Sequence, residues 1–266
     1  MRLNIKHISH YSYSKSVAYA LQQVRQTPKP RPSQDVIDWR IDLSNAQQEV
    51  EFEDQFNNQT LLIRADENTA DIKITCRGVV ETHNKSGVLG PHRGPMPLWF
   101  FRRSTPLTQL GSGVRALIKE VDRDIDVLEQ LHSLMTLVGE NVAYETGQTD
   151  ARTTAEEALE QGCGVCQDHA HIFISGARAL GFPARYVSGY LMMDDRVEQE
   201  AAHAWADVHV PNLGWVGFDV SNRISPDERY VAIATALDYH GAAPIRGLVY
   251  GDHAEALAVQ IEVQQQ

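Results

Sequence analysis

Apolar and polar residues alternate along much of the first hundred residues. The segments 37–43 and 72–77 have an apolar residue at every second position. Successive side chains of a strand point to opposite faces, so both segments are predicted to be half-buried strands. Cys76 falls on the predicted buried face of the second segment, which favours an inert core residue. The opening residues 1–7 alternate too and indicate a first strand.

Turn-forming residues separate these strands. Prolines at 28, 30 and 32 cannot donate to a central ladder and predict a loop or a sheet edge. Residues 54–58 have the composition of a turn. Residues 90–97 are dense in glycine and proline, and beyond them the apolar period lengthens from two to about 3.6. We therefore expect an N-terminal β domain over 1–100 and a second domain over 101–266, which ends in further strands.

Two helices are predicted in the second region. The first starts near Asp124 as N-cap, carries an apolar stripe and ends at Gly139. The second starts at Thr154, where Glu157 three residues later completes a capping box, and ends at Gly162.

Composition and charge narrow the function. The chain has 266 residues, is 42% hydrophobic, and has a net charge of −11. This acidity argues against nucleic acid, whose binding depends on Lys and Arg. No apolar run is long enough to cross a bilayer, so no membrane partner is expected. Three cysteines make no disulfide framework, and residues 1–7 do not resemble an export signal, so the cytoplasm is the expected location.

The candidate chemistry lies in residues 161–171, where a glycine-rich turn leads into an apolar helix. Cys166 falls in the first turn of that helix, where free backbone N–H groups and the helix dipole stabilise a thiolate. Three other interpretations compete. Cys166 could be an unreactive buried cysteine, it could form a redox pair with Cys163, or both could bind zinc together with His169 and His171. No metal and no cofactor are expected.

A predicted hairpin downstream supplies possible partners. Residues 201–210 and 215–220 alternate like strands on either side of a turn. A loop over 210–212 would place Asp219 directly opposite His203. A loop over 211–214 would instead place Asp219 opposite Ala206, about 10 Å out of register at ~3.3 Å per residue. The sequence leaves both registers open.

Four segments in this order resemble the bacterial transglutaminase-like superfamily: 164–168, 184–190, 203–205 and 214–219. The likeness extends over about 125–225, and the preceding β region resembles the N-terminal domain that often accompanies this core. The resemblance implies an α+β, papain-like fold, in which a helix that carries the cysteine packs on an antiparallel sheet that carries histidine and aspartate. It assigns the role of nucleophile to Cys166. Gln167 and His169 depart from the family pattern, which weakens inference about the substrate.

The expected activity is hydrolysis of a peptide or protein amide by a triad of Cys166, His203 and Asp219 through a thioester. The alternatives are a protein-glutamine gamma-glutamyltransferase and a non-catalytic peptide-binding module on the same fold. Asp168 is expected to fix the start of the helix. Trp205, Trp215 and Tyr144 are candidate substrate-binding residues, although tryptophans in a sheet more often pack in the core. The oligomeric state is left open.

Overall fold

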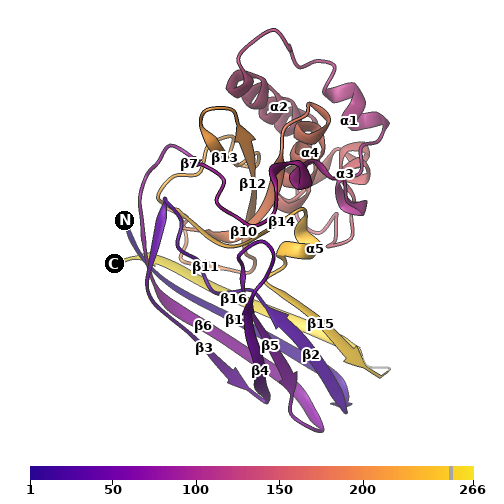
Figure 1. Ribbon diagram of the computed structural model, residues 1–266. Coiled ribbons are helices and arrows are strands. Elements are labelled where there is room, and N and C mark those ends of the chain that lie inside the picture. The colour runs from indigo at the N-terminus through magenta and orange to yellow at the C-terminus, as the bar shows by residue number, and fades with distance from the viewer. Residues whose placement is uncertain (252–253) are drawn as a thin grey trace.

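The computed structural model describes residues 1–251 and 254–266 and has two lobes (Figure 1). Antiparallel sheets form the lower lobe, and helices packed on a further sheet form the upper one. The N- and C-termini lie close together at one side of the lower lobe. The expected mixed α/β organisation, with an N-terminal β region and a helix-on-sheet core, is confirmed.

The lower lobe is built from two sheets that share an apolar core. The first has the strand order β11-β16-β1-β6-β3 and the second the order β15-β2-β5-β4. Residues facing each other across the two sheets, such as Ile63 and Ile74, are fully buried. The bounds of these strands are β1 Arg2–Val17, β2 Tyr19–Val24, β3 Gln34–Ser44, β4 Ala46–Glu53, β5 Gln59–Ala65, β6 Thr69–Thr82, β11 Glu198–Gln199, β15 Ile245–Tyr250 and β16 Glu255–Gln265.

The alternating segments form strands as predicted, with one local difference. Cys76 is fully buried within β6, as its position in the pattern indicated. In β3 the pairing with β6 shifts between Val36 and Asp38. A bulge inserts one unpaired residue and resets the alternation, which explains why Ile37 is exposed.

The last strands of the chain return to the lower lobe. β16 pairs with β1 along eleven residue pairs from Leu3↔Gln265 to Tyr13↔Glu255. β15 pairs with β2. The segment 101–266, which the sequence groups as one domain, therefore contributes its final strands to the sheets begun by residues 1–100.

The upper lobe contains the antiparallel sheet β14-β10-β12-β13-β7 and a small parallel pair, β8-β9. Its strands are β7 Val88–Gly90, β8 Ala143–Tyr144, β9 Cys163–Gly164, β10 Ala184–Leu191, β12 His203–Val210, β13 Gly214–Phe218 and β14 Tyr230–Ala236. The helices are α1 Ser112–Leu117, α2 Val127–Asn141, α3 Ala155–Gln161, α4 Cys166–Ala179 and α5 Tyr239–Ala242, with short 3-10 helices η1 Leu98–Arg102 and η2 Pro106–Thr108.

Local caps fix the helix ends. α3 has the predicted capping box between Thr154 and Glu157 and stops at Gly162, whose φ of 71° is left-handed. The N-cap of α2 is Asp126 and not Asp124, because the Asp126 side chain accepts from the amide of Leu128 at 2.8 Å. α2 also runs past Gly139, the predicted end, to Asn141.

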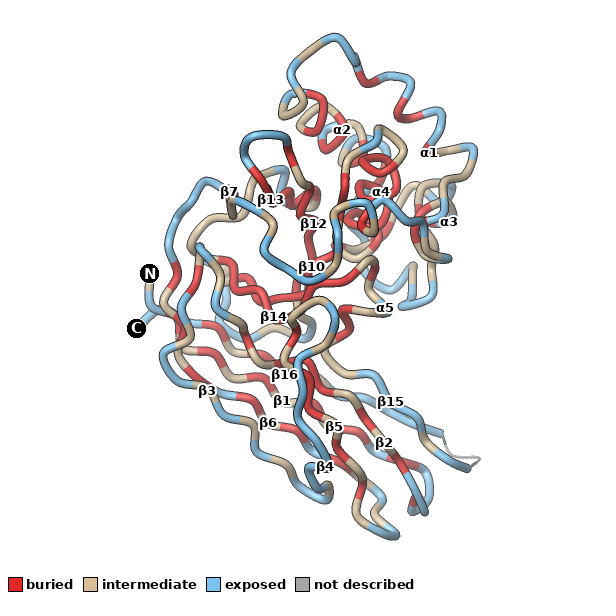
Figure 2. Tube along the Cα trace, viewed as in Figure 1, coloured by how far each residue is buried: buried red, intermediate tan, exposed pale blue. Residues whose placement is uncertain are grey.

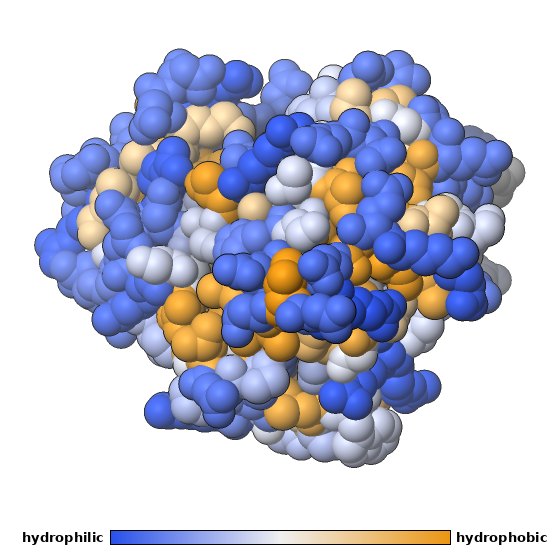
Figure 3. All heavy atoms as spheres, turned by 90° about the horizontal axis from the view of Figure 1, so that it is seen from above, coloured by the Kyte–Doolittle hydropathy of each residue, from blue (hydrophilic) through white to orange (hydrophobic). Residues whose placement is uncertain are grey.

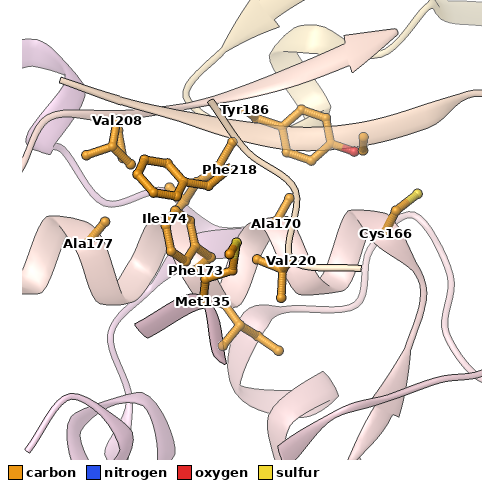
Figure 4. Packing of buried hydrophobic residues seen from close by; sticks show 14 of the residues in the cluster. Met135, Cys166, Ala170, Phe173, Ile174, Ala177, Tyr186, Val208, Phe218 and Val220 are labelled. Carbon is orange, nitrogen blue, oxygen red and sulfur yellow. The ribbon is translucent and has the colours of Figure 1, made fainter. Parts of the chain in front are cut away.

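Helix α4 is the centre of the upper lobe. Nearly all of its residues are buried (Figure 2). Ala170, Ile174 and Ala177 face Val208 and Phe218 of the sheet, whereas Cys166 lies at the start of the helix, beyond this packing (Figure 4). The apolar stripe therefore fixes the helix on the sheet and leaves its first turn available for chemistry.

Seen from above, the surface of the molecule is mostly hydrophilic, and its hydrophobic residues are separated by polar ones (Figure 3). Within 1–251 and 254–266, no helix combines the length and apolar character needed to cross a membrane.

Candidate active site

Cys166 is the first residue of α4, and the turn before it is shaped by Asp168. One oxygen of the Asp168 carboxylate accepts from the amide of Val165 at 2.8 Å and from the hydroxyl of Thr149 at 2.7 Å. The same carboxylate favours glycine at position 164, because a Cβ on that residue would lie only 2.7 Å from Asp168 Oδ2. Asp168 thus holds the start of the helix, as expected. The amides of Cys166 and Gln167 open the helix and have no carbonyl one turn earlier to bind.

The hairpin β12–β13 adopts a third register, between the two that the sequence left open. Val210 pairs with Gly214 and Ala206 with Phe218, so the loop is residues 211–213. Asn212 has a φ of 66° and Gly214 one of 81°, and this backbone conformation closes the short loop. Neither sequence alternative is therefore correct.

His203 and Asp219 nevertheless meet. Asp219 follows the last paired residue of β13 and leaves the ladder, forming an isolated bridge with Ile224. This turn brings its carboxylate to His203, whose Nε2 donates to Oδ2 at 2.6 Å. The same Oδ2 accepts from the hydroxyl of Tyr230 and from the side-chain amide of Asn222, each at 2.7 Å. Since Asp219 is fully buried, these donors replace the water that a carboxylate needs.

The electrostatics favour an imidazolium at His203. Burial opposes its charge, but the neighbouring charge of Cys166 and hydrogen bonds with Asp219 and Cys166 outweigh burial and raise the pKa of His203 to about 10. Burial also opposes the carboxylate of Asp219, yet its hydrogen bonds to His203, Tyr230 and Asn222 lower its pKa below the ordinary value. Because Nε2 is bound to Asp219, Nδ1 is the ring nitrogen that remains for Cys166.

The three candidate substrate-binding residues lie in different places. The ring of Trp205 stacks on the His203 ring, with 6.2 Å between the ring centroids, and meets the Tyr230 ring edge-on. It therefore packs against the histidine and restrains the position of the imidazole. Trp215 lies at the other end of the hairpin, under the guanidinium of Arg185. Both tryptophans are buried, and neither lines the cavity beside Cys166. Tyr144 is half exposed and does line it.

That cavity has a volume of about 740 Å³ and lies between the two lobes. Cys166 and His203 line one side. The connection from β10 to β12 lines another with residues 193, 196 and 198–202, and β11 within it pairs with β16 of the lower lobe. The remaining wall comes from the lower lobe and includes His7, Ser9 and Gln26. The site is thus a chamber at the junction of the lobes.

His169, His171 and Cys163, which the zinc and redox alternatives would require, each have surroundings of their own. His169 contacts the carbonyl of Val142 with Nε2 at 3.0 Å and the hydroxyl of Ser221 with Nδ1 at 2.9 Å. His171 accepts the amide of Tyr239 through Nε2 at 3.1 Å. Cys163 lies in β9, which pairs with β8 and packs beside α3, and it does not line the cavity.

Sequence reasoning missed Tyr230, Asn222 and the wall from the lower lobe. Asp219 carried a local signal for this turn, because an aspartate side chain often accepts from a backbone amide shortly after it, and here the amide of Asn222 donates to Asp219 Oδ1 at 3.3 Å. Tyr230 begins β14, which is separated from β12 by β10 in the sheet, and His7 is 196 positions before His203 in the chain. Contacts of that range depend on the folded sheets and leave no local pattern.

Comparisons with known proteins agree with this architecture. Residues 115–220 match the model of the transglutaminase-like superfamily, and residues 3–81 match that of the bacterial transglutaminase-like N-terminal region. An uncharacterized protein of Mycobacterium leprae is 25% identical over 98% of this chain and 98% of its own length. An uncharacterized protein of Mycobacterium tuberculosis is 37% identical over 47% of this chain and 43% of its own.

Two further proteins have more descriptive names. A protein-glutamine gamma-glutamyltransferase of Pseudomonas aeruginosa is 31% identical over 33% of this chain and 15% of its own length. The crystal structure of "a putative cysteine protease" from Cytophaga hutchinsonii superposes with a TM-score of 0.79, covering 100% of this chain and 91% of that one at 22% identity. At that identity the superposition establishes the shared fold.

Proposed function

Because the chain belongs to the transglutaminase-like superfamily, we propose that it is a cysteine-dependent amide hydrolase in which Cys166, His203 and Asp219 form the catalytic triad. The observation that supports this most is the placement of the three residues: Cys166 begins α4 and lines the same cavity as His203, and His203 Nε2 is held 2.6 Å from Asp219 Oδ2. A nucleophile, a base and a group that orients the base are thereby aligned.

The reaction divides into acylation and deacylation. The thiolate of Cys166 attacks the amide carbonyl carbon, and the imidazolium of His203 gives its proton to the nitrogen of the leaving amine as the C–N bond breaks. The product is a thioester on Cys166 and a free amine. His203 then takes a proton from water, the hydroxide attacks the thioester, and the carboxylic acid leaves as the thiolate is restored. Asp219 stabilises the imidazolium and fixes its orientation throughout.

The oxyanion formed in each step needs hydrogen-bond donors. The backbone amide of Cys166 is the candidate, because it is one of the unpaired amides at the N-terminus of α4 and points with the positive end of the helix dipole. Gln167 adds the next amide of the same turn and also lines the cavity.

Transfer of the acyl group to an amine is the second candidate function. The likeness of part of the chain to the Pseudomonas glutamyltransferase favours it. The thioester is the same in both cases, so the difference lies in whether water or an amine reaches it.

Partitioning of the thioester separates these two functions. The protein is incubated with a casein substrate, with and without a large excess of a dansylated primary amine, and both released amine and incorporated label are measured. We expect release of amine without incorporation, and loss of both in Cys166→Ala. Incorporation in excess of hydrolysis would show that the protein is a transferase.

A further inference from the structure

The side chain of Tyr186 reaches from the upper sheet to the cavity beside Cys166. Tyr186 lies on β10, between β14 and β12, and its ring packs on the side of the strand that faces α4, with 5.1 Å between its centroid and that of the His171 ring. Figure 4 shows its hydroxyl pointing toward the end of α4 at which Cys166 begins the helix. Both residues line the same cavity. The sheet therefore places a phenol next to the reacting thiol.

Residues of three elements hold this ring in place. His171 of α4 lies against it at an interplanar angle of 42°, and Tyr239 at the start of α5 meets it edge-on, with 6.0 Å between the ring centroids. Nε2 of His171 accepts from the amide of Tyr239 at 3.1 Å, which ties the two flanking residues together. Tyr186 itself is only 1% exposed. A ring packed in this way needs no reorganisation when a charge develops beside its hydroxyl.

The hydroxyl at the tip of this ring is free. Over the described parts of the chain, 1–251 and 254–266, no group forms a hydrogen bond with it, and it is not sealed from solvent as the unpaired Tyr13 hydroxyl is. Two other buried tyrosines of the same sheet do bind within the fold: Tyr190 to His7, and Tyr230 to Asp219. Buried polar groups are nearly always paired. A hydroxyl left unpaired at the cavity beside a reactive cysteine therefore indicates a partner that arrives with the substrate.

The phenol keeps its proton at neutral pH. Burial raises the pKa of Tyr186 well above its ordinary value, and the charge of Cys166 raises it further. Tyr186 is thus a neutral donor that does not compete with His203 for the proton of the thiol. A phenol that donates to an oxyanion forms a charge-assisted hydrogen bond, which is about twice as strong as one between neutral groups.

We propose that the Tyr186 hydroxyl is the side-chain donor of the oxyanion hole and acts beside the backbone amide of Cys166. When the thiolate adds to a carbonyl carbon, the π electron pair moves to the oxygen, and that oxygen accepts from both donors. Tyr186 keeps its proton throughout. As the leaving group departs, the pair returns to re-form the carbonyl, and the hydrogen bond weakens to that of a neutral acceptor. This inference rests on the proposed acyl chemistry at Cys166.

Two other tyrosines line the cavity near Cys166, and neither has this combination of features. Tyr144 is half exposed, so water competes for its hydroxyl and weakens any hydrogen bond that it makes. Burial, Cys166 and then Asp219 raise its pKa to about 12, so Tyr144 lies toward the triad. Tyr239 is the edge-on support of Tyr186 and is less deeply buried. Of the three, Tyr186 combines a fixed, buried ring with a free hydroxyl.

Two small reagents separate donation to an oxyanion from activation of the thiol. p-Nitrophenyl acetate acylates a thiolate through a tetrahedral oxyanion, whereas iodoacetamide alkylates it by direct displacement of iodide, without an oxyanion. Tyr186→Phe keeps the ring and removes only the hydroxyl. We expect acylation, measured as the burst of p-nitrophenolate that Cys166→Ala lacks, to slow at least about tenfold in Tyr186→Phe, and casein hydrolysis to fall by about 10² to 10³. The rate of alkylation of Cys166 should stay unchanged.

Tyr190→Phe is the matched control, since it removes a hydroxyl from the same strand where that hydroxyl binds His7. It should leave both rates unchanged and lower the thermal midpoint. Tyr186→Phe should not lower the midpoint, because its hydroxyl binds nothing within the fold.

Several outcomes would overturn the proposal. They are equal slowing of both reagents in Tyr186→Phe, slowing of neither, a loss of acylation confined to Tyr239→Phe, or a parent protein that the ester does not acylate. The ester assay does not require an amide to be hydrolysed. A protein that shows the Tyr186 effect with the ester and no hydrolysis of casein would therefore contradict the proposed hydrolase and leave the role of Tyr186 intact.

Discussion

Asp219 shows how one buried carboxylate can organise a site. Its Oδ2 accepts from His203, Tyr230 and Asn222, so each donor restrains the carboxylate and the carboxylate restrains the imidazole. In Asp219→Asn the negative charge is lost, and an amide cannot accept from all three donors at one oxygen.

Asp219→Asn should reduce hydrolysis by on the order of 10² to 10⁴. Loss of the carboxylate also lowers the pKa of His203 from its value of about 10. The imidazolium then loses its proton at a lower pH, so the basic limb of the pH–rate profile should move to lower pH. Asp35→Asn is the control, because Asp35 forms the same kind of pair with His83 in an exposed position. An unchanged basic limb would show that Asp219 does not act through His203.

Burial of His7 predicts a dependence of stability on pH. The folded protein holds the pKa of His7 at about 4, whereas an unfolded chain takes up the proton near 6.5. Below pH 6.5 the unfolded state binds more protons, so the free energy of unfolding falls as pH falls. The loss is about 1.4 kcal/mol per pH unit and about 3 kcal/mol by pH 4.

Urea unfolding at pH 7, 6 and 5 measures this slope. His7→Gln should have a shallower dependence than the parent protein, whatever its absolute stability, and His83→Gln should match the parent. Equal slopes for the parent and His7→Gln would mean that His7 is not held neutral by the fold.

The start of α4 is the element on which the nucleophile depends. A Cβ at Gly164 would lie 2.7 Å from the Asp168 carboxylate, which holds the amide of Val165. Gly164→Ala should therefore push Asp168 away, reduce the rate of hydrolysis at least tenfold and cost about 1–3 kcal/mol of stability.

Gly176→Ala is the matched control for this prediction. It makes the same change within α4, but the new Cβ meets only side-chain atoms of Leu134 at 3.0 Å and Ile118 at 3.4 Å. Activity should be retained, as measured by steady-state hydrolysis and thermal unfolding of both variants. If both variants lose activity equally, the turn before Cys166 has no special role.

The sequence predicted elements better than the pairing between them. The capping box of α3 and the position of Cys166 in the first turn of α4 follow from local residue chemistry, and the structure has both. The hairpin was predicted, but its register was wrong in both alternatives, because register depends on a left-handed Asn212 and on the departure of Asp219 from the ladder. No short-range pattern records either feature.

At the scale of the whole molecule, the two lobes are tied by buried polar contacts. Arg31 and Arg185 both bind the fully buried Asp207, at 2.7 and 2.8 Å. Burial opposes the charge of Asp207, but the two arginines outweigh it and lower its pKa below the usual value. The Asn58 side chain accepts from and donates to the backbone of Thr235. Such contacts join residues of the first sixty positions to the upper sheet, which is why the sequence could not reveal the chamber between them.

These contacts predict that the lobes unfold together. Urea unfolding followed by far-UV circular dichroism and by alkylation of the buried Cys76 should give one coincident transition. Arg31→Ala should lower the urea midpoint of both signals together, because it removes one of the two partners of the buried Asp207 carboxylate. Two separated transitions in the parent protein would show that the lobes are independently stable.

The proposed hydrolysis depends on Cys166 being an activated nucleophile paired with His203. The most direct measurement is the rate of alkylation by iodoacetamide between pH 5 and 9, resolved by mass spectrometry of the peptides that contain Cys166 and Cys163. We expect Cys166 to react faster than glutathione at pH 6, His203→Ala to remove this advantage, and Cys163→Ala to leave it intact. A Cys166 that reacts no faster than glutathione at any pH, and equally with or without His203, would show that it is not an activated nucleophile.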